Sequence, residues 1–341
     1  MKKWIWLVLL GIVALGIIAG KGFFEKAPEP GIDMIRAENS APKQKLEAVI
    51  NSPPVSTRTL LTHIQKLNYQ RYSDAERASA RSYIATELKK YGWKPKLQKF
   101  PQGINIVAER GGTDQKAGTI LVGAHYDTVY QSPGADDNAS GIAVVLEIAR
   151  LFGSQPTKRT LQLVLFDKEE AGLLGSKAFV AKTTNITNLR GAVVMDMVGY
   201  ACHTPGCQKY PATLPVTPPS DKGDFLTVIG DIEHLPLLNS FQISASEQTN
   251  LPAVLTLPIP LKGLLTPDTL RSDHAPFWYQ GIGAVLVTDT ANLRTPHYHQ
   301  PSDTSTNIEQ NFFAGSAQVV VNATKNLLDS SATLSSSAEQ T

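Results

Sequence analysis

The segment Leu121–Gly141, LVGAHYDTVYQSPGADDNASG, sets one histidine and a run of carboxylates in what its composition indicates is a loop. An apolar, strand-like run, Thr119–Val122, leads into it, and the helical pattern AVVLEIARLF at 143–152 follows it. Carboxylates that are buried or clustered are costly unless a cation holds them. The segment therefore predicts a metal site between a strand and a helix.

Strand-like and helical patterns alternate through most of the chain. The expected helices are 60–67, 74–92 with Ser73 as a capping residue, 144–152, 173–182 and 312–328, and the expected strands are 93–100, 104–109, 119–122, 161–166, 192–197 and 282–287. This alternation favours an α/β fold, with a mixed, mostly parallel central sheet flanked by helices on both faces. The proline-bearing stretches 201–224 and 248–268 carry little pattern, and we expect long loops there that act as lids or pocket walls.

In such sheets, ligands bind at the carboxyl ends of the strands. Acidic and imidazole side chains fall at the expected strand ends, and five can ligate a metal: His125, Asp137, Glu170, Asp196 and either His297 or His299. A ligand set of imidazoles and carboxylates without a thiolate suits zinc, or a related divalent metal ion such as manganese or cobalt. Two histidines and three carboxylates are enough for two metals that share one bridging carboxylate.

Each candidate has an ordinary structural alternative. An aspartate in Gly-Ala-Asp-Asp-Asn is more often a turn or helix-capping residue, and we expect that role for Asp136. A Glu-Glu pair is usually solvated, but Glu169 and Glu170 follow the apolar strand LQLVLF. Asp196 lies within the apolar VVMDMV, where an unpaired charge would be penalised. Surface or structural roles are expected for three other histidines, His203, His234 and His274.

The first 24 residues predict an export segment. Lys2 and Lys3 precede an apolar run from Trp4 to Ala19, which is somewhat short for a membrane span of roughly 20 residues. We expect an uncleaved anchor with the body on the periplasmic or extracytoplasmic side, in preference to a cleaved signal and secretion or to a buried helix. The chain is then divided into an anchor or signal at 1–24, a spacer at 25–55, a folded domain with the predicted metal site at 56–328 and a disordered tail at 329–341.

Charge and cysteine content narrow the possible partners and compartment. The 32 basic and 30 acidic residues give a formal net charge of +2, and no long basic run follows residue 3, so nucleic acid is not expected as a partner. Two cysteines, Cys202 and Cys207, lie close together in a stretch with Pro205 and Gly206. In an exported protein that spacing is compatible with a small disulfide loop, and free thiols are the alternative. Nothing in the sequence decides the oligomeric state.

Six motifs in order extend the argument beyond single residues. They are GAHYDT at 123–128, GADDNASG at 134–141, the Glu-Glu after the Phe-Asp strand end at 166–170, DMVG at 196–199, RSDHAPF at 271–277 and YHQPSDT at 298–304. Together they closely resemble peptidase family M28, two-zinc aminopeptidases with a single α/β catalytic domain of the zinc-dependent exopeptidase fold. The resemblance covers roughly Leu60 to Leu328.

The resemblance implies a role for each matching residue. The implied ligands are His125 on one zinc, Asp137 as the bridging carboxylate, Asp196 on the other metal, and Glu170 and His299. The implied catalytic residues are Glu169 as general base, Asp127 as the acid that orients His125, and Tyr298, which steadies the oxyanion in some members. In the implied reaction two zinc ions activate a water and polarise the scissile carbonyl, while Glu169 moves the proton to the leaving amine. Some relatives also carry a small disulfide loop that borders the pocket.

The expected function is that of an aminopeptidase acting on peptides with a free amino terminus, for which Asp273 is a candidate binding residue. A carboxypeptidase or amidohydrolase of the same family is an alternative, because Arg271 and Arg294 could meet a substrate carboxylate. A glutaminyl cyclase would use one zinc and lack His125, and an inactive, receptor-like relative would lack ligands or the base. Lys168 is a cation directly before the glutamate pair, but neighbouring strand-end residues can point apart.

Overall fold

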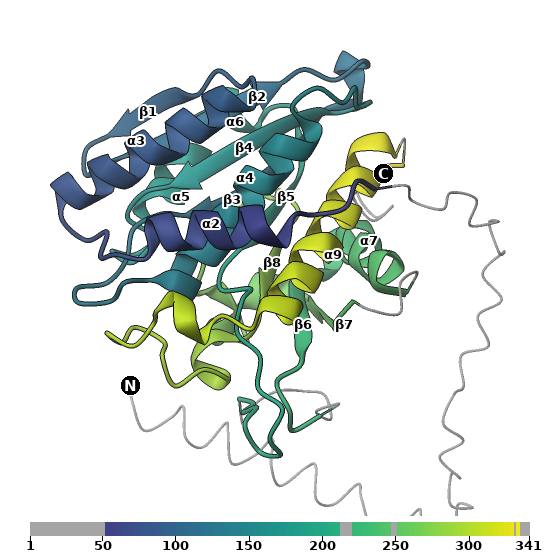
Figure 1. Ribbon diagram of the computed structural model, residues 1–341. Helices are drawn as coiled ribbons and strands as arrows, with labels where there is room; N and C mark the ends of the chain where they lie inside the picture. The colour runs from purple at the N-terminus through teal and green to yellow at the C-terminus, as the bar shows by residue number, and fades with distance from the viewer. Residues whose placement is uncertain (1–51, 212–219, 247–250, 331, 335–341) are drawn as a thin grey trace, which may run out of the picture. The chain divides into compact units, whose positions relative to one another are not determined.

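A computed structural model describes residues 52–211, 220–246, 251–330 and 332–334 (Figure 1). The predicted anchor or signal at 1–24 and nearly all of the spacer lie outside the described residues, as does most of the predicted tail. No helix in the described part of the chain is both long enough and apolar enough to cross a bilayer. Export and anchoring therefore stay predictions from the sequence.

In the part of the chain that the structure describes, eight strands form one sheet in the order β1-β2-β4-β3-β5-β8-β6-β7. They are β1 Lys96–Phe100, β2 Gly103–Arg110, β3 Thr119–His125, β4 Thr160–Phe166, β5 Leu189–Met195, β6 Phe225–Asp231, β7 Ala253–Ile259 and β8 Ala284–Thr288. The pairs β3–β4, β3–β5, β5–β8 and β6–β7 are parallel, whereas β1–β2, β2–β4 and β6–β8 are antiparallel. The prediction of a mixed, mostly parallel sheet is confirmed.

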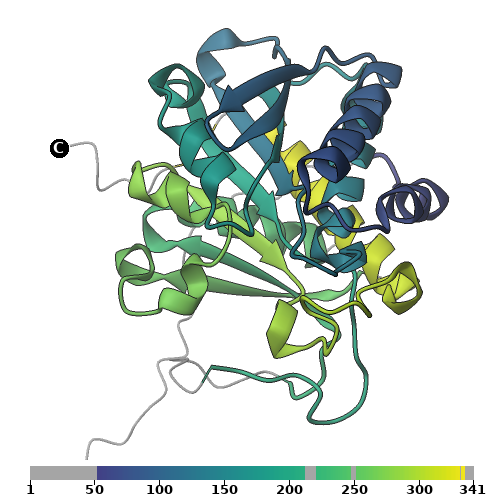
Figure 2. The ribbon, with the colours of Figure 1, turned by 90° about the vertical axis from the view of Figure 1, so that its left-hand side faces the viewer.

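Helices pack on both faces of this sheet (Figure 2). They are α2 Thr57–Leu67, α3 Asp74–Lys90, α4 Gly141–Phe152, α5 Leu174–Val180, α6 Thr183–Ile186, α7 Leu235–Ser246, α8 Ala275–Tyr279 and α9 Gln310–Asp329. Buried apolar residues of α2, α3, α4, α7 and α9 share one core cluster, and those of α5 and α8 share a second. Successive residues of β4, Leu163 and Val164, belong to different clusters, because side chains alternate between the faces of a sheet.

The predicted start of α3 is explained by a capping box. The Ser73 hydroxyl accepts a hydrogen bond from the Glu76 N–H, and the Glu76 carboxylate accepts one from the Ser73 N–H. Two amide groups that the helix itself leaves without partners are satisfied in this way. The box therefore begins α3 at Asp74, as the sequence predicts.

The prediction of a long loop at 248–268 is wrong for the centre of that segment, which forms strand β7. Neither β6 nor α7, which precede it, was predicted as an element. The strand lies at the edge of the sheet, most of its residues are half-buried or exposed, and Pro258 lies within it. Edge strands tolerate proline and lack a fully apolar pattern, so this segment has the composition of a loop.

Two smaller differences concern helix ends. The helix predicted at 173–182 is α5, which ends at Val180, and the separate α6 follows it. The tail predicted to be disordered from Asp329 begins with packed residues: Leu334 is buried, and the carbonyl of Ala332 accepts a hydrogen bond from Arg159. The rest of that tail, residues 331 and 335–341, lies outside the described residues.

Candidate metal centre

All five predicted ligands lie near the carboxyl ends of the central strands of the sheet. His125 is the last residue of β3, Glu170 lies shortly after β4, Asp196 directly follows β5, Asp137 lies in the turn Ala135–Ser140, and His299 lies in the segment after β8. Because β3, β4, β5 and β8 are parallel neighbours, their carboxyl ends meet there. The structure moves two predicted strand ends, since β3 extends beyond Val122 to include His125, and β5 ends at Met195, just before Asp196.

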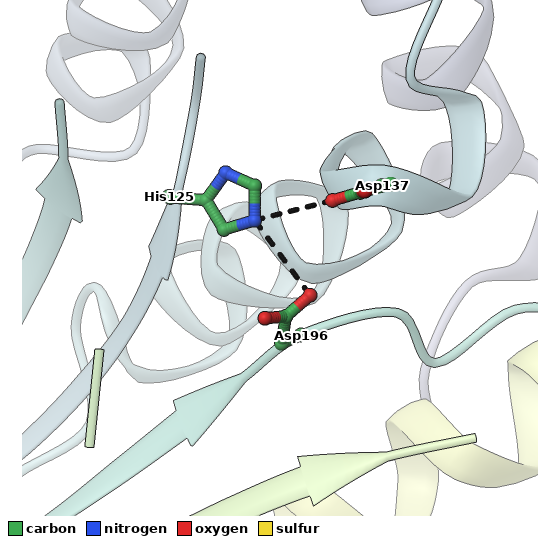
Figure 3. A group of neighbouring side chains, drawn as sticks. All are labelled: His125, Asp137 and Asp196. Carbon is green, nitrogen blue, oxygen red and sulfur yellow. Dashed lines mark ion pairs between the residues drawn. The ribbon is translucent and has the colours of Figure 1, made fainter. Parts of the chain in front are cut away.

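Asp137 lies between two groups of side chains. Figure 3 shows the first, in which His125 Nε2 lies 3.2 Å from Asp137 Oδ1 and 3.6 Å from Asp196 Oδ1. In the second group, His299 Nε2 lies 3.3 Å from Asp137 Oδ2 and 3.1 Å from Glu170 Oε2. Each carboxylate oxygen of Asp137 therefore faces a different histidine and a different acid.

These separations fit ligands around metal ions. Two ligands that are each 2.0–2.1 Å from a tetrahedral zinc lie about 3.3 Å from one another. The four distances given above fall between 3.1 and 3.6 Å. In addition, Glu170 Oε1 is buried and has no hydrogen-bond partner among the described residues. The imidazole and carboxylate donors fit one zinc on each side of Asp137.

The electrostatics of these residues also favour a cation. Burial raises the pKa of Glu170 to about 7, and the charge of Asp137 adds to this shift. Burial opposes ionisation of Asp137 as well, but hydrogen bonds from His125 and His299 hold the pKa of Asp137 well below its ordinary value. The pKa of His299 rises to about 10 despite burial, because Asp137 and Glu170 are its partners. Buried acids outnumber the imidazoles, and a bound cation would offset the excess negative charge.

Asp127 connects the ends of β3 and β4. Its Oδ1 and Oδ2 accept hydrogen bonds from the backbone N–H groups of Glu169 at 3.0 Å and Glu170 at 3.2 Å. His125 Nδ1 lies 3.2 Å from the Asp127 carbonyl oxygen and 3.6 Å from its carboxylate. The predicted orienting contact to His125 is thus mainly through the backbone carbonyl, while the carboxylate holds the segment that carries the two glutamates.

Glu169 is buried next to the ligands. Its carboxyl oxygen lies within 4.8 Å of ligand atoms of His125 and Glu170. Burial raises the pKa of Glu169 well above its ordinary value; His125 opposes this shift, and the charges of Asp196 and Glu170 add to it. The preceding Lys168 has its ammonium group 5.8 Å from the ring centre of Tyr72. The side chains of Lys168 and Glu169 therefore have different surroundings, as expected.

Tyr298 lies beside the last predicted ligand. Its ring stacks on that of His299, with centroids 3.7 Å apart, and its hydroxyl oxygen accepts a hydrogen bond from Arg271 Nη2 at 3.1 Å. Arg271 also bonds to Asn292. The other arginine considered for a substrate carboxylate, Arg294, is buried and donates to Gln208 and to the carbonyls of Tyr200 and Phe225.

The structure changes the interpretation of two aspartates. Asp136, expected to be a turn or capping residue, is buried, and its Oδ1 accepts a hydrogen bond from the Gly199 N–H at 2.9 Å. Asp273, a candidate for binding the substrate amine, is fully buried and accepts a hydrogen bond from the Ser176 hydroxyl. It is not among the residues that line the cavity below, so the structure gives no support for direct contact with a substrate.

Asp303 is a residue of the site that sequence reasoning missed. Its Oδ1 and Oδ2 accept hydrogen bonds from the backbone N–H groups of Asp136 at 2.9 Å and Asp137 at 3.0 Å. Asp303 therefore links the turn that carries Asp137 to the segment that carries His299. It lies in the YHQPSDT motif, which was a signal for importance, but its partners are backbone atoms that no side-chain pattern reveals.

The remaining sequence candidates have structural partners. His203 is exposed near Asp224, His234 is buried against Asp231, and His274 is buried with its Nε2 2.8 Å from the Thr269 carbonyl oxygen. Cys202 and Cys207 form the disulfide that their spacing allowed.

A cavity of about 490 Å³ opens from the candidate metal centre. Asp137, Glu169, Glu170, Asp196 and His299 line one part of it. Apolar side chains of the strands β6, β7 and β8 line another part, namely Phe225, Ile229, Leu255, Leu257 and Leu286. The candidate site therefore combines a polar, metal-ligating wall with an apolar recess.

Comparison with known proteins finds a family match over part of the chain and a shared fold. Residues 105–217 match the model of peptidase family M28, which confirms the resemblance of the motifs. The uncharacterized protein YfbL of Escherichia coli (strain K12) is 35% identical over 214 residues, which are 59% of this chain and 64% of YfbL. The chain thus spans less than two thirds of that relative.

Two solved structures share the fold. BSAP, a zinc aminopeptidase from Bacillus subtilis, matches with a TM-score of 0.64 and 17% identity over 82% of this chain and 98% of its own. A glutaminyl cyclase of Bacteroides thetaiotaomicron matches with a TM-score of 0.58 and 18% identity over 81% of this chain and 99% of its own. At these identities the likeness shows the fold alone, and one fold here carries two activities.

Proposed function

We propose that this chain, a member of peptidase family M28, is a two-zinc aminopeptidase that releases amino-terminal residues from peptides. The observation that carries the proposal is the position of Asp137, whose two oxygens face two separate histidine–carboxylate groups. That arrangement is the one expected of a carboxylate shared by two metals.

Each metal would have its own ligands besides the shared aspartate. His125 and Asp196 would hold one zinc, and Glu170 and His299 the other. Zinc bound there would lower the pKa of a water molecule and polarise a carbonyl group. Asp127 keeps the Glu169–Glu170 backbone against the end of β3.

Glu169 is the general base and acid in this proposal. It accepts a proton from the attacking water and returns the proton to the leaving amine. Its burial beside His125 and Glu170 supports this role. The stacked Tyr298 offers a hydroxyl group near His299 for the developing oxyanion, with Arg271 as its hydrogen-bond partner.

The apolar recess supports a preference for substrates with a large apolar amino-terminal residue. Burying such a side chain in the recess would contribute roughly 1.5–3 kcal/mol. The same cavity favours one alternative, because Arg271 lines it and could meet a substrate carboxylate, as a carboxypeptidase requires. Substrates with blocked amino or carboxyl ends distinguish these two activities.

We also propose that the catalytic domain works outside the cytoplasm. It is either anchored to the membrane by residues 1–24 or released by cleavage of that segment. The lysines and the apolar run at the beginning of the sequence support export, and so does the Cys202–Cys207 disulfide, since disulfides persist in oxidising compartments. Fractionation of cells that express the full chain tests location, and the amino-terminal sequence of the mature protein tests cleavage.

The function is tested with aminoacyl anilides, peptides with a blocked amino end and peptides with a blocked carboxyl end. The proposal predicts activity on anilides and on peptides with a free amino end, loss of activity with a chelator, and recovery on addition of zinc. Activity that survives complete metal removal would contradict the mechanism. Activity that requires a free carboxyl end would instead favour the carboxypeptidase alternative.

A further inference from the structure

Arg71 is a fully buried arginine in the turn between α2 and α3, and the hydrogen bonds of its side chain all go to backbone carbonyl groups. Nε donates to the carbonyl of Tyr126 at 2.8 Å. Nη1 donates to the carbonyls of Leu67, of Tyr69 at 3.0 Å and of Pro133 at 2.8 Å. Nη2 donates to the carbonyls of Gly134 at 2.8 Å and of Asp137 at 3.5 Å. Within the described residues no ion pair joins it to an acid. Burying a charge without an ion pair costs free energy. An arginine at this position therefore points to a specific structural or functional role.

The carbonyl groups that Arg71 binds belong to the two segments that carry metal ligands. Tyr126 directly follows His125, whereas Pro133, Gly134 and Asp137 belong to the turn that carries Asp137. The Arg71 backbone N–H also donates to the hydroxyl of Thr128, at 2.9 Å, in the first segment. One guanidinium group therefore fixes the separation between the backbone near His125 and the backbone near Asp137.

The turn is held from the opposite side by an acid. Asp303 accepts hydrogen bonds from the N–H groups of Asp136 and Asp137, while Arg71 donates to the carbonyl groups of the same turn. A cation on the carbonyl side and a carboxylate on the amide side complement the peptide dipoles.

Gly134 makes the close approach of the guanidinium possible. It has a positive φ of 60°, and a Cβ atom there would lie 2.7 Å from Arg71 Nη2 and 2.3 Å from the Asp137 carbonyl oxygen. The turn is thus shaped around the guanidinium, which within the described residues donates to backbone carbonyl groups and not to a ligand side chain.

We propose that Arg71 is a positioning residue of the metal centre, which sets the geometry of His125 and Asp137 through their backbones and thereby the affinity for zinc. The inference rests on the metal centre proposed above and goes beyond it, since it assigns a role to a residue outside the ligand set. Partners behind a ligand typically change metal affinity by about 10- to 100-fold when they are replaced.

The test compares Arg71 with Arg159 in the full chain. Arg159 is also buried and also donates to backbone carbonyls, those of Ala117, Leu327 and Ala332, but none of these lies in a ligand segment. Arg71→Lys and Arg71→Ala are measured beside Arg159→Lys and Arg159→Ala. The readouts are zinc affinity by competition with a chelator, the visible spectrum of the cobalt-loaded protein, and thermal unfolding of the metal-free protein.

The Arg71 variants are expected to bind zinc about 10- to 100-fold more weakly and to show an altered cobalt spectrum, whereas the Arg159 variants are destabilised without either change. Guanidinium ion is expected to restore part of the zinc affinity of Arg71→Ala. If that variant does not fold, Arg71→Lys decides, because lysine keeps the charge but not the planar set of donors.

The inference is overturned if Arg71→Lys binds zinc with the affinity and cobalt spectrum of the unaltered chain, or if the two arginines give equal losses of affinity. These results leave the proposed function intact. If the unaltered chain itself binds no zinc, the metal centre, and with it both proposals, is wrong.

Discussion

The carboxylate of Asp127 accepts a hydrogen bond from the backbone N–H of Glu169, with 3.0 Å between Oδ1 and the nitrogen. Its other oxygen accepts one from Glu170. Because these bonds join the ends of β3 and β4, Asp127 aligns the proposed base and one proposed ligand. Asp127→Asn keeps one acceptor and replaces the other with a donor, so one N–H group loses its partner.

Asp127→Asn is therefore expected to lower kcat/KM by about 10- to 100-fold with little change in fold. Circular dichroism and kinetics on an aminoacyl anilide measure the two effects. Asp114→Asn is the matched control, because Asp114 also accepts a backbone N–H but in an exposed turn. Equal kinetics for the two variants would contradict the role of Asp127.

Glu169→Gln tests the proton-transfer role. The amide has nearly the same shape but cannot accept the proton of the attacking water, so kcat is expected to fall by about 100- to 10,000-fold. Zinc content, measured by atomic emission, should stay at the value of the unaltered chain because Glu169 is not a proposed ligand. A variant that loses metal would show that Glu169 is a ligand instead.

Ile229→Trp tests the apolar recess. Ile229 lies on β6 in the cavity lining, and a larger side chain there reduces the space for a substrate side chain. We expect kcat/KM for a phenylalanyl anilide to fall by at least about 10-fold relative to an alanyl anilide. Leu261→Trp, at an exposed apolar residue outside the cavity lining, is the control and should leave the ratio unchanged.

His274 makes stability depend on pH. Burial lowers its pKa from 6.5 to about 4, although the hydrogen bond to Thr269 and the charge of Asp196 oppose the shift. The unfolded chain therefore binds a proton below pH 6.5 that the folded chain does not accept until about pH 4. The contribution of neutral His274 is complete above pH 6.5 and is lost as the pH falls through this window.

The loss from His274 between pH 7 and pH 4 is about 3 kcal/mol of unfolding free energy. Urea unfolding is measured against pH for the metal-free unaltered chain and for metal-free His274→Gln. The comparison isolates the contribution of His274, because the other titratable groups are present in both proteins. The variant should lose less stability on acidification. His203→Gln, at an exposed histidine, is the control, and parallel pH curves for His274→Gln and the unaltered chain would refute the assignment.

The parts of the molecule that could be predicted were those with a pattern in the side chains. The apolar strands that end at His125 and near Asp196 are buried on both faces, so their composition marked them. Likewise the five candidate ligands are chemically distinctive, and the structure brings all five together. That they bind zinc stays a prediction.

Elements and contacts without such a pattern were missed. Strand β7 lies at the sheet edge, half-buried and interrupted by Pro258, so it has the composition of a loop. Arg71 and Asp303 act on backbone N–H and carbonyl groups, which every residue carries, and their partners are distant in sequence. Only the folded chain shows that both hold the turn around Asp137.

The central claim is that Asp137 joins two zinc sites. It is tested most directly by titrating the metal-free full chain with zinc in a calorimeter and counting the equivalents bound. The account predicts two zinc ions per chain, with both sites weakened in Asp137→Ala, since each oxygen of Asp137 faces one site. A single equivalent, or none, in the unaltered chain would contradict it.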